Sequence, residues 1–523
     1  MIAVHPYTRY AQALIMLEYK LTDCEEITSE HLISEINNGL HTFRMSPAKV
    51  FEGKTSVVYE YGKIEKGDTS RGVFLAPNII STDKQANNTW KAAVGLLEDF
   101  NSKQITANAD LTMSVSPTSG EYLSFSLNGG IGRGKPKSTL LEQSLSAVTT
   151  LTSLKPCFQY RIDKKGMPEI FNVCLIPDLP IREMMDFISF FKKMLYHHTD
   201  NGLMIGNVVV KETGKGANKK ITYSPKRPLI YKGNFPNPPH SSAMGCIAIL
   251  GAIGEFTKEA EYSEQATRVL ESLKNTEIYL MKYGGATTFK YNHHVIDIAK
   301  ESKLKTIVDS MYYSQLYRGK RFANEKDFDS NTEYQKFDLF TSRFLQLFNH
   351  AAFKDFLAFR AEYPNPVEIL FTTYYTKMEK AIDSKIVSSA KILGRWLNQV
   401  AFFAAKSELK EGETNYWDKL RKEKAKGLVE FESSIFSSKT GDALIAQTLI
   451  RAGRMSKYDA PEEASLFIEK TMSGEISLNS AKNLLIAFSR LKNKSDENVQ
   501  EENGIEDDNE DDFYNQNEEI SYE

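Results

Sequence analysis

A glycine-rich loop at residues 128–137 has the residue types that bind phosphate. Gly129, Gly134 and Lys135 show the glycine spacing and the lysine of a P-loop, the phosphate-binding loop of nucleotide hydrolases. Pro136 stands where a P-loop needs the Ser or Thr that holds magnesium, so the hydrolase motif is incomplete. Exposed backbone N–H groups can bind phosphate without a metal, so the loop fits a nucleic-acid contact as well as a solvated linker. Its basic residues are Arg133, Lys135 and Lys137.

Two more clusters of glycine and basic residues follow. The segment 211–220 predicts the tip of a β-hairpin, and such a ribbon can enter a groove of a duplex or follow its backbone. The segment 317–322 interleaves basic and aromatic residues, which suits both phosphate contact and base stacking. Either cluster alone also fits a solvated loop. We predict contacts with a nucleic-acid backbone from Lys215, Lys219, Lys220, Lys226, Arg227, Arg318, Lys320 and Arg321.

Basic residues also gather in the helical C-terminal part of the chain. Lys391, Arg395 and Asn398 are spaced to share one helix face, opposite an apolar seam. In the next predicted helix we expect a run of basic residues to be largely exposed. Such a run is usually a solvated face, but here it could line a groove for a single strand of nucleic acid. The run consists of Lys419, Arg421, Lys422, Lys424 and Lys426.

The charge of the chain is distributed unevenly. The formal net charge is −3, but residues 495–523 contain 13 acidic residues and no Lys or Arg. The remainder has 65 basic and 55 acidic residues, a net charge of +10 that favours a polyanionic partner. The acidic segment is too polar to bury a core, so we predict a disordered tail.

The residue pattern gives little support for catalysis. The four cysteines are scattered without a CxxC pair, which argues against a disulfide framework and a cysteine zinc site. The His pairs at 197–198 and 293–294 lack further ligands at helical spacing, so we expect them at helix ends or on the surface. We predict no catalytic residue, no metal and no cofactor. Two alternatives stay open: a divergent nuclease or nucleotide hydrolase that uses the 129–135 loop, and a scaffold that binds only proteins.

Neither export nor membrane insertion is indicated. The N-terminus lacks a basic region followed by an apolar run, which a signal peptide requires. The longest apolar stretch, Met244–Ile253, is shorter than the ~20 residues that span a bilayer. We expect a cytoplasmic protein without a membrane partner.

The hydrophobic periodicity predicts an α+β fold, in which a mixed α/β body with antiparallel hairpins precedes a C-terminal all-helical bundle. We predict a nucleic-acid-binding body at 1–335, a helical connector at 336–377, the bundle at 378–494 and the tail at 495–523. Strands are expected at 56–61, 72–75, 111–115, 122–127, 157–162, 169–176, 207–210, 222–223 and 277–283. Helices are expected at 138–151, 180–196, 242–256, 262–273, 337–362, 366–381, 383–409, 418–436, 440–455 and 478–491, and one that begins near Asp459.

This layout resembles the large subunit of type I CRISPR interference complexes, known as Cascade. Two stretches carry the resemblance. One is Phe171–Pro180 with the helix that follows it to Tyr196, and the other is Ser388–Lys406 in the first bundle helix. They cover part of the chain, and the likeness is nearest the PGING-like subtype.

The resemblance implies a non-enzymatic role in antiviral defence. Such subunits bind the 5′ end of the CRISPR RNA, recognise the protospacer-adjacent motif of duplex DNA, help to open the strands and recruit a helicase-nuclease. The implied partners are therefore the guide RNA, double-stranded DNA, the displaced single strand, the other Cascade subunits and the helicase-nuclease. The motif contacts are implied for Asn128, Gly129, Gly130, Arg133, Lys135 and Lys137.

The resemblance also gives the bundle a role. It is similar to the small subunit that lines the displaced strand. Some relatives make that subunit from an internal start in the same gene, which raises the hypothesis of a second product from Met378. The displaced-strand groove is implied for Lys391, Arg395, Lys419, Arg421 and Lys422.

Overall fold

The computed structural model forms two compact units, Met1–Lys305 and Thr306–Glu523. Each unit is considered by itself. The structure describes residues 5–48, 55–62, 73–110, 112–116, 137–164, 167–214, 219–235, 244–274, 276–291, 293–311, 315–316, 343–344, 346–347, 353–357, 361–378, 382–410, 414–456 and 459–492.

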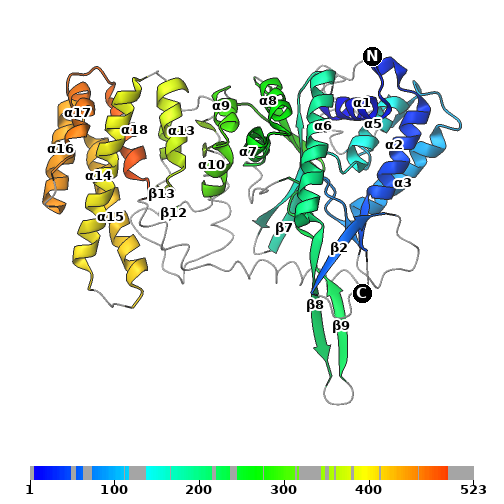
Figure 1. Cartoon of the computed structure of the whole chain (residues 1–523), viewed down its shortest axis with the longest axis horizontal. Coiled ribbons are helices and arrows are strands. Elements are labelled where there is room, and N and C mark those ends of the chain that lie inside the picture. The colour runs from blue at the N-terminus through cyan, green and yellow to red at the C-terminus, as the bar shows by residue number, and fades with distance from the viewer. Residues whose placement is uncertain are drawn as a thin grey trace. The chain divides into compact units, whose positions relative to one another are not determined.

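At the start of the first unit, several helices pack around α5 (Leu140–Leu151), in which nearly all residues are buried. α1 (Pro6–Tyr19) is capped by His5, whose side chain accepts a hydrogen bond from the Tyr7 N–H, and Pro6 occupies its first turn. It packs on α5 (Leu140–Leu151) and α6 (Ile181–His198), and α5 also contacts α2 (Ser29–Thr42) and α3 (Asp83–Asp99). Figure 1 shows α1, α2, α3, α5 and α6 gathered in one part of this unit.

Two antiparallel sheets complete the first unit. One has the order β3-β1-β2-β8-β9 and the other β11-β10-β7-β6. A short pair, β4 with β5, lies apart from both. The strands are β1 (Arg44–Pro47), β2 (Ser56–Tyr61), β3 (Phe74–Leu75), β4 (Asn108–Asp110), β5 (Lys137–Thr139), β6 (Cys157–Lys164), β7 (Met167–Pro177), β8 (Ile205–Thr213), β9 (Lys220–Pro225), β10 (Ile278–Lys282) and β11 (Gly285–Phe289).

A second layer of short helices covers the four-stranded sheet. α7 is apolar all round and contacts β10, α8 and α9, which explains why nearly every residue in it is buried. These helices are α7 (Gly245–Glu255), α8 (Ser263–Ser272) and α9 (His294–Lys300). The next helix, α10 (Leu304–Met311), begins in the last two residues of the first unit and continues into the second.

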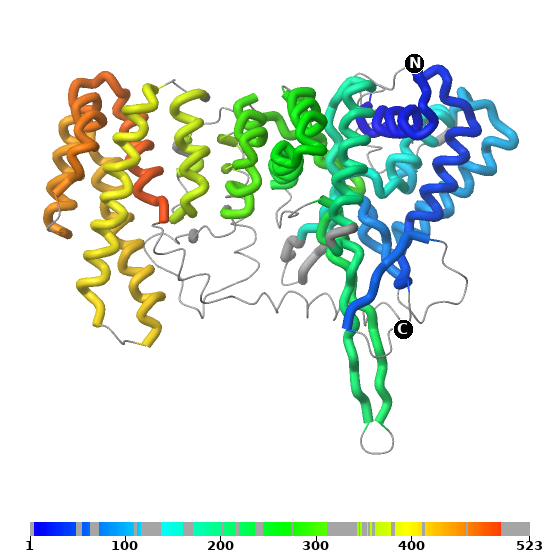
Figure 2. The backbone as a smooth tube through the Cα atoms, in the orientation of Figure 1, coloured from blue at the N-terminus to red at the C-terminus, as the bar shows by residue number. Residues whose placement is uncertain are grey.

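The second unit is a helical bundle with one short strand pair. α14 (Ser384–Glu408) contacts α15 (Tyr416–Ser437), α16 (Gly441–Met455), α17 (Ser465–Met472) and α18 (Leu478–Ser489). The tube in Figure 2 shows these helices side by side. Before them lie β12 (Gln315–Leu316), α12 (Phe353–Leu357), β13 (Ala361–Glu362), α13 (Val367–Thr373) and a π-helical turn, Tyr374–Met378.

The α+β prediction is confirmed, with mixed structure first and a helical bundle last. Two local predictions are wrong. Thr112–Val115 is a turn rather than part of a strand, closed by hydrogen bonds from the N–H groups of Val115 and Ser116 to the Thr112 carbonyl. The helix predicted at 337–362 contains strand β13, because Ala361 and Glu362 pair with β12. The strand predicted at 122–127 lies outside the described residues.

Candidate nucleic-acid interface

A two-stranded ribbon carries most of the charge of the first unit. β2 pairs with β8 from Ser56 to Val58, and the Val208 N–H donates to the Thr55 carbonyl at 3.0 Å. β8 and β9 pair further, as far as Thr213 and Lys220. Figure 1 shows them projecting from the rest of the unit. Between 205 and 232 the sequence has seven Lys or Arg and one acidic residue, a net charge of +6. The whole segment 1–305 has 36 basic and 31 acidic residues, a net charge of +5. The ribbon and its base together thus have more net positive charge than the whole segment 1–305, which favours contact with a polyanion.

The predicted residues of this ribbon lie at its two ends. Lys219 and Lys220 are exposed next to the tip, where Lys219 forms an ion pair with Glu212. Lys226 and Arg227 directly follow β9 at its base. Six residues of strand span about 20 Å. The ribbon can thus offer cations to several successive phosphates. Lys215 lies outside the described residues.

Arg227 is held at the base of the ribbon by two aromatic rings. Its guanidinium carbon lies 5.0 Å from the ring centre of Tyr231 and 5.5 Å from that of Phe74. The two rings meet edge to face, with centres 5.6 Å apart. Such cation–π contacts orient a guanidinium without neutralising it. Phe74 and Tyr231 were not predicted, because only the sheet brings them to Arg227 from distant positions in the chain.

The glycine-rich loop lies almost entirely outside the described residues. Asn128, Gly129, Gly130, Arg133 and Lys135 belong to that part of the chain. Lys137 is the first residue of β5, where its backbone pairs with Asp110 of β4. The third basic cluster, Arg318, Lys320 and Arg321, also lies outside the described residues.

The predicted basic face of α14 contacts other parts of the bundle. Lys391 Nζ lies 2.6 Å from Glu368 Oε1, and Arg395 Nη2 lies 2.5 Å from Glu368 Oε2. Arg395 also donates to Asn365 Oδ1 at 3.0 Å. Asn398 is fully buried rather than on an exposed face, and it donates to the Ser489 carbonyl. The prediction of a shared exposed face is wrong for Asn398, because β13 and α18 supply its hydrogen-bond partners and it is buried. Lys391 and Arg395 stay half-buried beside α13.

Lys424 is also buried, which corrects its predicted exposure. Its side chain is 4% exposed and its ammonium lies 2.5 Å from Glu362 Oε1. Burial alone would raise the pKa of Glu362, but the Lys424 charge and its hydrogen bond outweigh it and hold that pKa below the usual value. This lysine stabilises the bundle and is not available to a ligand.

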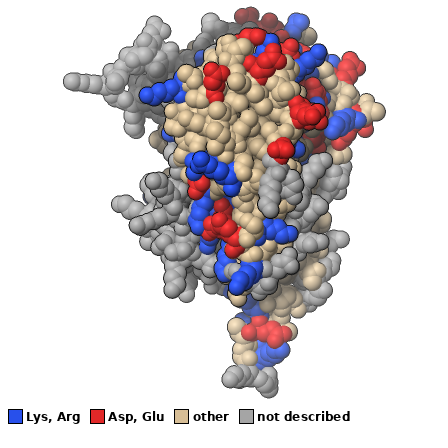
Figure 3. Space-filling model, turned by 90° about the vertical axis from the view of Figure 1, so that its left-hand side faces the viewer, with Lys and Arg blue, Asp and Glu red and all other residues tan. Residues whose placement is uncertain are grey.

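The remaining cations of α15 are at least partly exposed. Lys419 is exposed, Lys422 is half-buried, and Arg421 Nη1 lies 3.6 Å from Asp418. Trp417 is 48% exposed at the start of the same helix, beside Lys419 in sequence. Figure 3 faces this unit and shows basic and acidic side chains interspersed on the described part of the surface. On this face the described cations are thus separated by acidic side chains, and Trp417 is one of several exposed aromatic rings of the bundle, together with Phe403 and Phe436.

The thiols and the described histidine pairs show no arrangement suited to catalysis. All four cysteines are buried and free, and burial raises the pKa of Cys157 to about 11, so its thiol stays protonated. His197 and His198 end α6 and His294 begins α9, as predicted. Burial, followed by the charges of His197 and Lys305, lowers the pKa of His198 to about 4. No group of three His, Cys, Asp or Glu side chains among the described residues could hold a metal ion.

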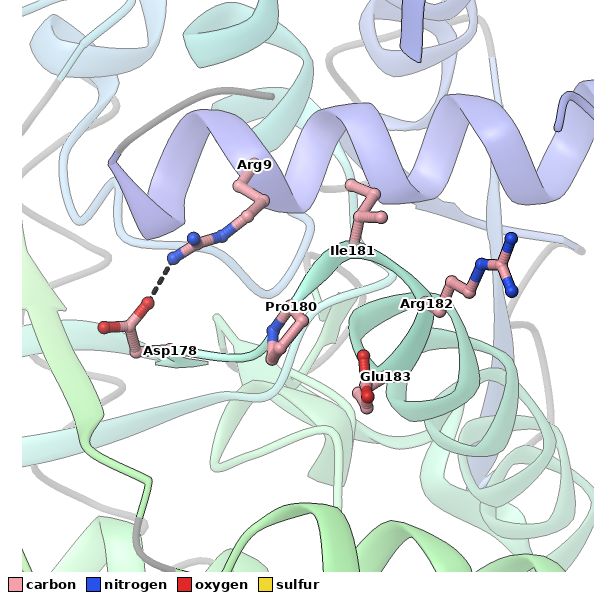
Figure 4. Close-up of a pocket in the computed structure, with 6 residues that line it drawn as sticks. All are labelled: Arg9, Asp178, Pro180, Ile181, Arg182 and Glu183. Carbon is pink, nitrogen blue, oxygen red and sulfur yellow. Dashed lines mark hydrogen bonds and ion pairs between the residues drawn. The ribbon is translucent and has the colours of Figure 1, made fainter. Parts of the chain in front are cut away.

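One pocket lies at the beginning of α6, where Arg9 of α1 reaches Asp178. Figure 4 shows the Arg9 guanidinium directed at the Asp178 carboxylate, with which it forms an ion pair, while the Arg182 side chain points away. Because Asp178 already neutralises Arg9, this arginine offers little attraction to a phosphate in the pocket. Its lining is Arg9, Asp178, Pro180, Ile181, Arg182 and Glu183.

Comparison with known proteins gives one match. The family described as CRISPR-associated protein Csp2 matches residues 5–492, nearly the whole chain. No curated protein matches. The match includes both stretches of the resemblance, which form β7 with the start of α6 and the middle of α14. No helix in the described part of the chain is long and apolar enough to cross a membrane.

Proposed function

This chain belongs to the CRISPR-associated protein Csp2 family, and from that membership we propose what it does as the large subunit of a Cascade complex. We propose that it binds the 5′ end of the guide RNA and recognises the protospacer-adjacent motif of target duplex DNA. It then helps the strands to separate and recruits a separate helicase-nuclease. The chain itself cleaves nothing. The family match over residues 5–492 is the observation that carries this proposal.

The ribbon supports a role in contacting the nucleic-acid backbone. Lys219 and Lys220 lie near the tip of the projecting ribbon, and Arg227 lies at its base; residues 205–232, which include the ribbon and its base, have a net charge of +6. Phosphate contacts position a protein on nucleic acid, whereas contacts with base edges specify sequence. The ribbon therefore supplies affinity and orientation. Lys215, Lys226, Arg318, Lys320 and Arg321 are proposed for the same backbone role.

Motif recognition is proposed for the glycine-rich loop, through Asn128, Gly129, Gly130, Arg133, Lys135 and Lys137. A glycine backbone can approach a duplex closely, and arginine or lysine can bind guanine edges as well as phosphates. For the displaced strand, Lys419, Arg421 and Lys422 of α15 are the better candidates. Lys391 and Arg395 share the Glu368 carboxylate and would have to exchange that partner for a phosphate.

The test compares two sets of charge-removing substitutions in the full chain assembled with its complex. One variant is R133A/K135A/K137A in the loop, and the other is K219A/K220A/R227A in the ribbon. We expect both to weaken binding of target duplex about ten-fold or more at low salt. Each lost phosphate contact lowers the slope of log affinity against log salt by about 0.9. Only the loop variant should lose discrimination between duplexes with and without the motif.

The matched control is K84A/K91A/K103A, which removes three exposed lysines on and beside α3. It changes the net charge equally and should leave both affinity and discrimination unchanged. Equal motif discrimination in the loop variant and the unchanged chain would remove the loop from motif recognition. Metal-dependent DNA cleavage or ATP turnover by the purified chain would instead favour the enzyme alternative. Absence of binding to RNA and duplex DNA would favour the protein-only scaffold.

A further inference from the structure

The β8–β9 ribbon has two chemically different faces. Residues paired across an antiparallel ladder lie on the same face, and successive residues alternate between faces. The register pairs Val208 with Pro225, Val210 with Tyr223 and Glu212 with Ile221. These six residues form what we call the apolar face. The opposite face has Val209 with Ser224, Lys211 with Thr222 and Thr213 with Lys220, and we call it the basic face.

The apolar face continues the core side of the five-stranded sheet. Val57 of β2 pairs with Gly206 of β8, and both are buried. A Cβ on Gly206 would lie 2.6 Å from a ring carbon of Tyr59, so this side of β8 is packed against the core. Val208 and Val210 follow Gly206 on the same side. The side of β8 that faces the core at Gly206 therefore continues along the ribbon with Val208 and Val210, beyond the core itself.

Beyond that point the apolar side chains are open to water. Val210 is 49% exposed and Ile221 is 46% exposed. Glu212 is the only charged residue among the six, and its ion pair with Lys219 leaves the face without a net charge. A two-stranded ribbon without a packing partner is marginally stable in water. Within the described part of the chain, the outer end of the apolar face thus has no cover that would stabilise the ribbon.

We propose that the apolar face docks on a neighbouring protein subunit of the Cascade complex, which presents an uncharged, apolar surface. The two faces divide the ribbon's partners by chemistry. The lysines of the basic face suit phosphates, whereas a face of valine, isoleucine, tyrosine and proline with one paired glutamate offers no positive charge to a polyanion. This inference goes beyond the nucleic-acid contacts proposed above and depends only on membership of a multi-subunit complex.

The size of the apolar face favours a different subunit over a second copy of this chain. Two strands of six residues cover on the order of 200 Å². A stable dimer needs about 800 Å² from each partner. The face is too small to hold a second copy alone. It suits one anchor in a larger interface between subunits that also meet elsewhere, as they do in a guide-RNA complex.

The experiment measures binding of the full chain to a complex assembled with guide RNA but lacking this subunit. The test variant is V210T/I221T, because threonine keeps the β-branched shape and strand propensity while adding a hydroxyl. The matched control is V209T, the same change on the basic face. We expect the test variant to bind about ten-fold more weakly at both low and high salt, and V209T to bind like the unchanged chain.

A second measurement needs no substitution. Hydrogen exchange of the backbone amides of β8 and β9 should slow in the unchanged chain when the complex assembles. Unchanged affinity in V210T/I221T, or unchanged exchange on assembly, would overturn the proposal. A defect of V210T/I221T that appears only when DNA is added would assign the face to nucleic acid and overturn it too. If the purified chain forms dimers and the V210T/I221T variant does not, the face binds a second copy of the chain. That result would also overturn the proposal.

Discussion

Single residues of the second unit show how charge is used inside the bundle. Two ion pairs are buried there: Lys424 with Glu362, and Arg490 with Glu432 at 2.5 Å. Arg490 also donates to the Leu357 carbonyl at 2.9 Å and to the Tyr363 hydroxyl. A buried pair costs desolvation and adds little over apolar packing, but it specifies which segments meet. Here the first pair joins β13 to α15, and the second joins α15 to the end of α18. Arg490 also connects the end of α18 to Leu357 and Tyr363.

The Glu362→Gln substitution should destabilise the chain strongly. It leaves the Lys424 ammonium buried without a counter-charge, and breaking such a pair costs about 3–5 kcal/mol. The measurement is the free energy of unfolding by urea. The control is Glu423→Gln, which removes the half-buried partner of the exposed Lys426 and should cost less than about 1 kcal/mol.

The sign of the pH dependence gives a second readout for the same variant. The folded pKa of Glu362 is below its ordinary value, so its contribution is present above that value and is lost as pH falls through the folded pKa. Glu362→Gln should therefore reduce the acid sensitivity of unfolding. Equal stability of Glu362→Gln and the unchanged chain would contradict the role given to this pair.

At the scale of elements, the bundle requires residues that precede Met378. The Tyr363 N–H donates to the Arg490 carbonyl at 2.7 Å, and the Lys492 N–H donates to the Tyr363 carbonyl at 2.8 Å. The ring of Phe371 packs on Phe488 of α18, and Glu362 supplies the partner of Lys424. A product starting at Met378 would lack all of these contacts. Its core and its ion pair would be incomplete.

We therefore expect a fragment of residues 378–494 to unfold far more readily than one of residues 353–494. The shorter fragment leaves Lys424 uncompensated and removes the aromatic contacts of α12 and α13. Thermal melting followed by circular dichroism would compare the two. A cooperative melt of the 378–494 fragment at the temperature of the longer one would refute this expectation. It would also support a separate small subunit from an internal start.

The elements show which parts of the fold the sequence can predict. α6 and α14 were predicted within two residues at each end, because each has an apolar stripe at helical spacing. α1 was not predicted, since its residues from Pro6 to Met16 are buried on nearly all sides and show no stripe. β13 was hidden because two residues of strand are specified by pairing with β12, not by local pattern.

The candidate site follows the same rule. The clustering of Lys219, Lys220, Lys226 and Arg227 was visible in the sequence, because it depends on neighbours along the chain. The apolar face of the ribbon required the register, because one shifted residue would move Val210 to the other face. The burial of Lys424 could not be predicted, since Glu362 lies 62 residues away.

At the scale of the whole molecule, positive and negative net charge lie in different segments of the chain. The segments 1–305 and 306–494 each have a net charge of +5, whereas residues 495–523 contain 13 acidic residues and no basic ones. The first segment concentrates its excess on the ribbon. In the second, basic and acidic side chains are interspersed (Figure 3). A covalently attached polyanion has a high effective concentration near any basic surface that it can reach.

Deleting residues 495–523 should therefore increase non-specific binding of duplex DNA about three- to ten-fold at low salt, because the tail no longer competes for basic surfaces such as the ribbon. The measurement is the affinity for a duplex without the motif across a salt series.

Replacing the 13 acidic residues by Asn and Gln should have the effect of the deletion, whereas shuffling the order of the tail residues should change nothing. The effect should vanish at high salt, where screening removes the competition together with the binding. Unaltered affinity on deletion would show that the tail does not compete. The K219A/K220A/R227A chain supplies the decisive comparison. If the tail competes for the ribbon, its deletion should increase DNA binding much less in this variant, in which residues 205–232 retain a net charge of only +3.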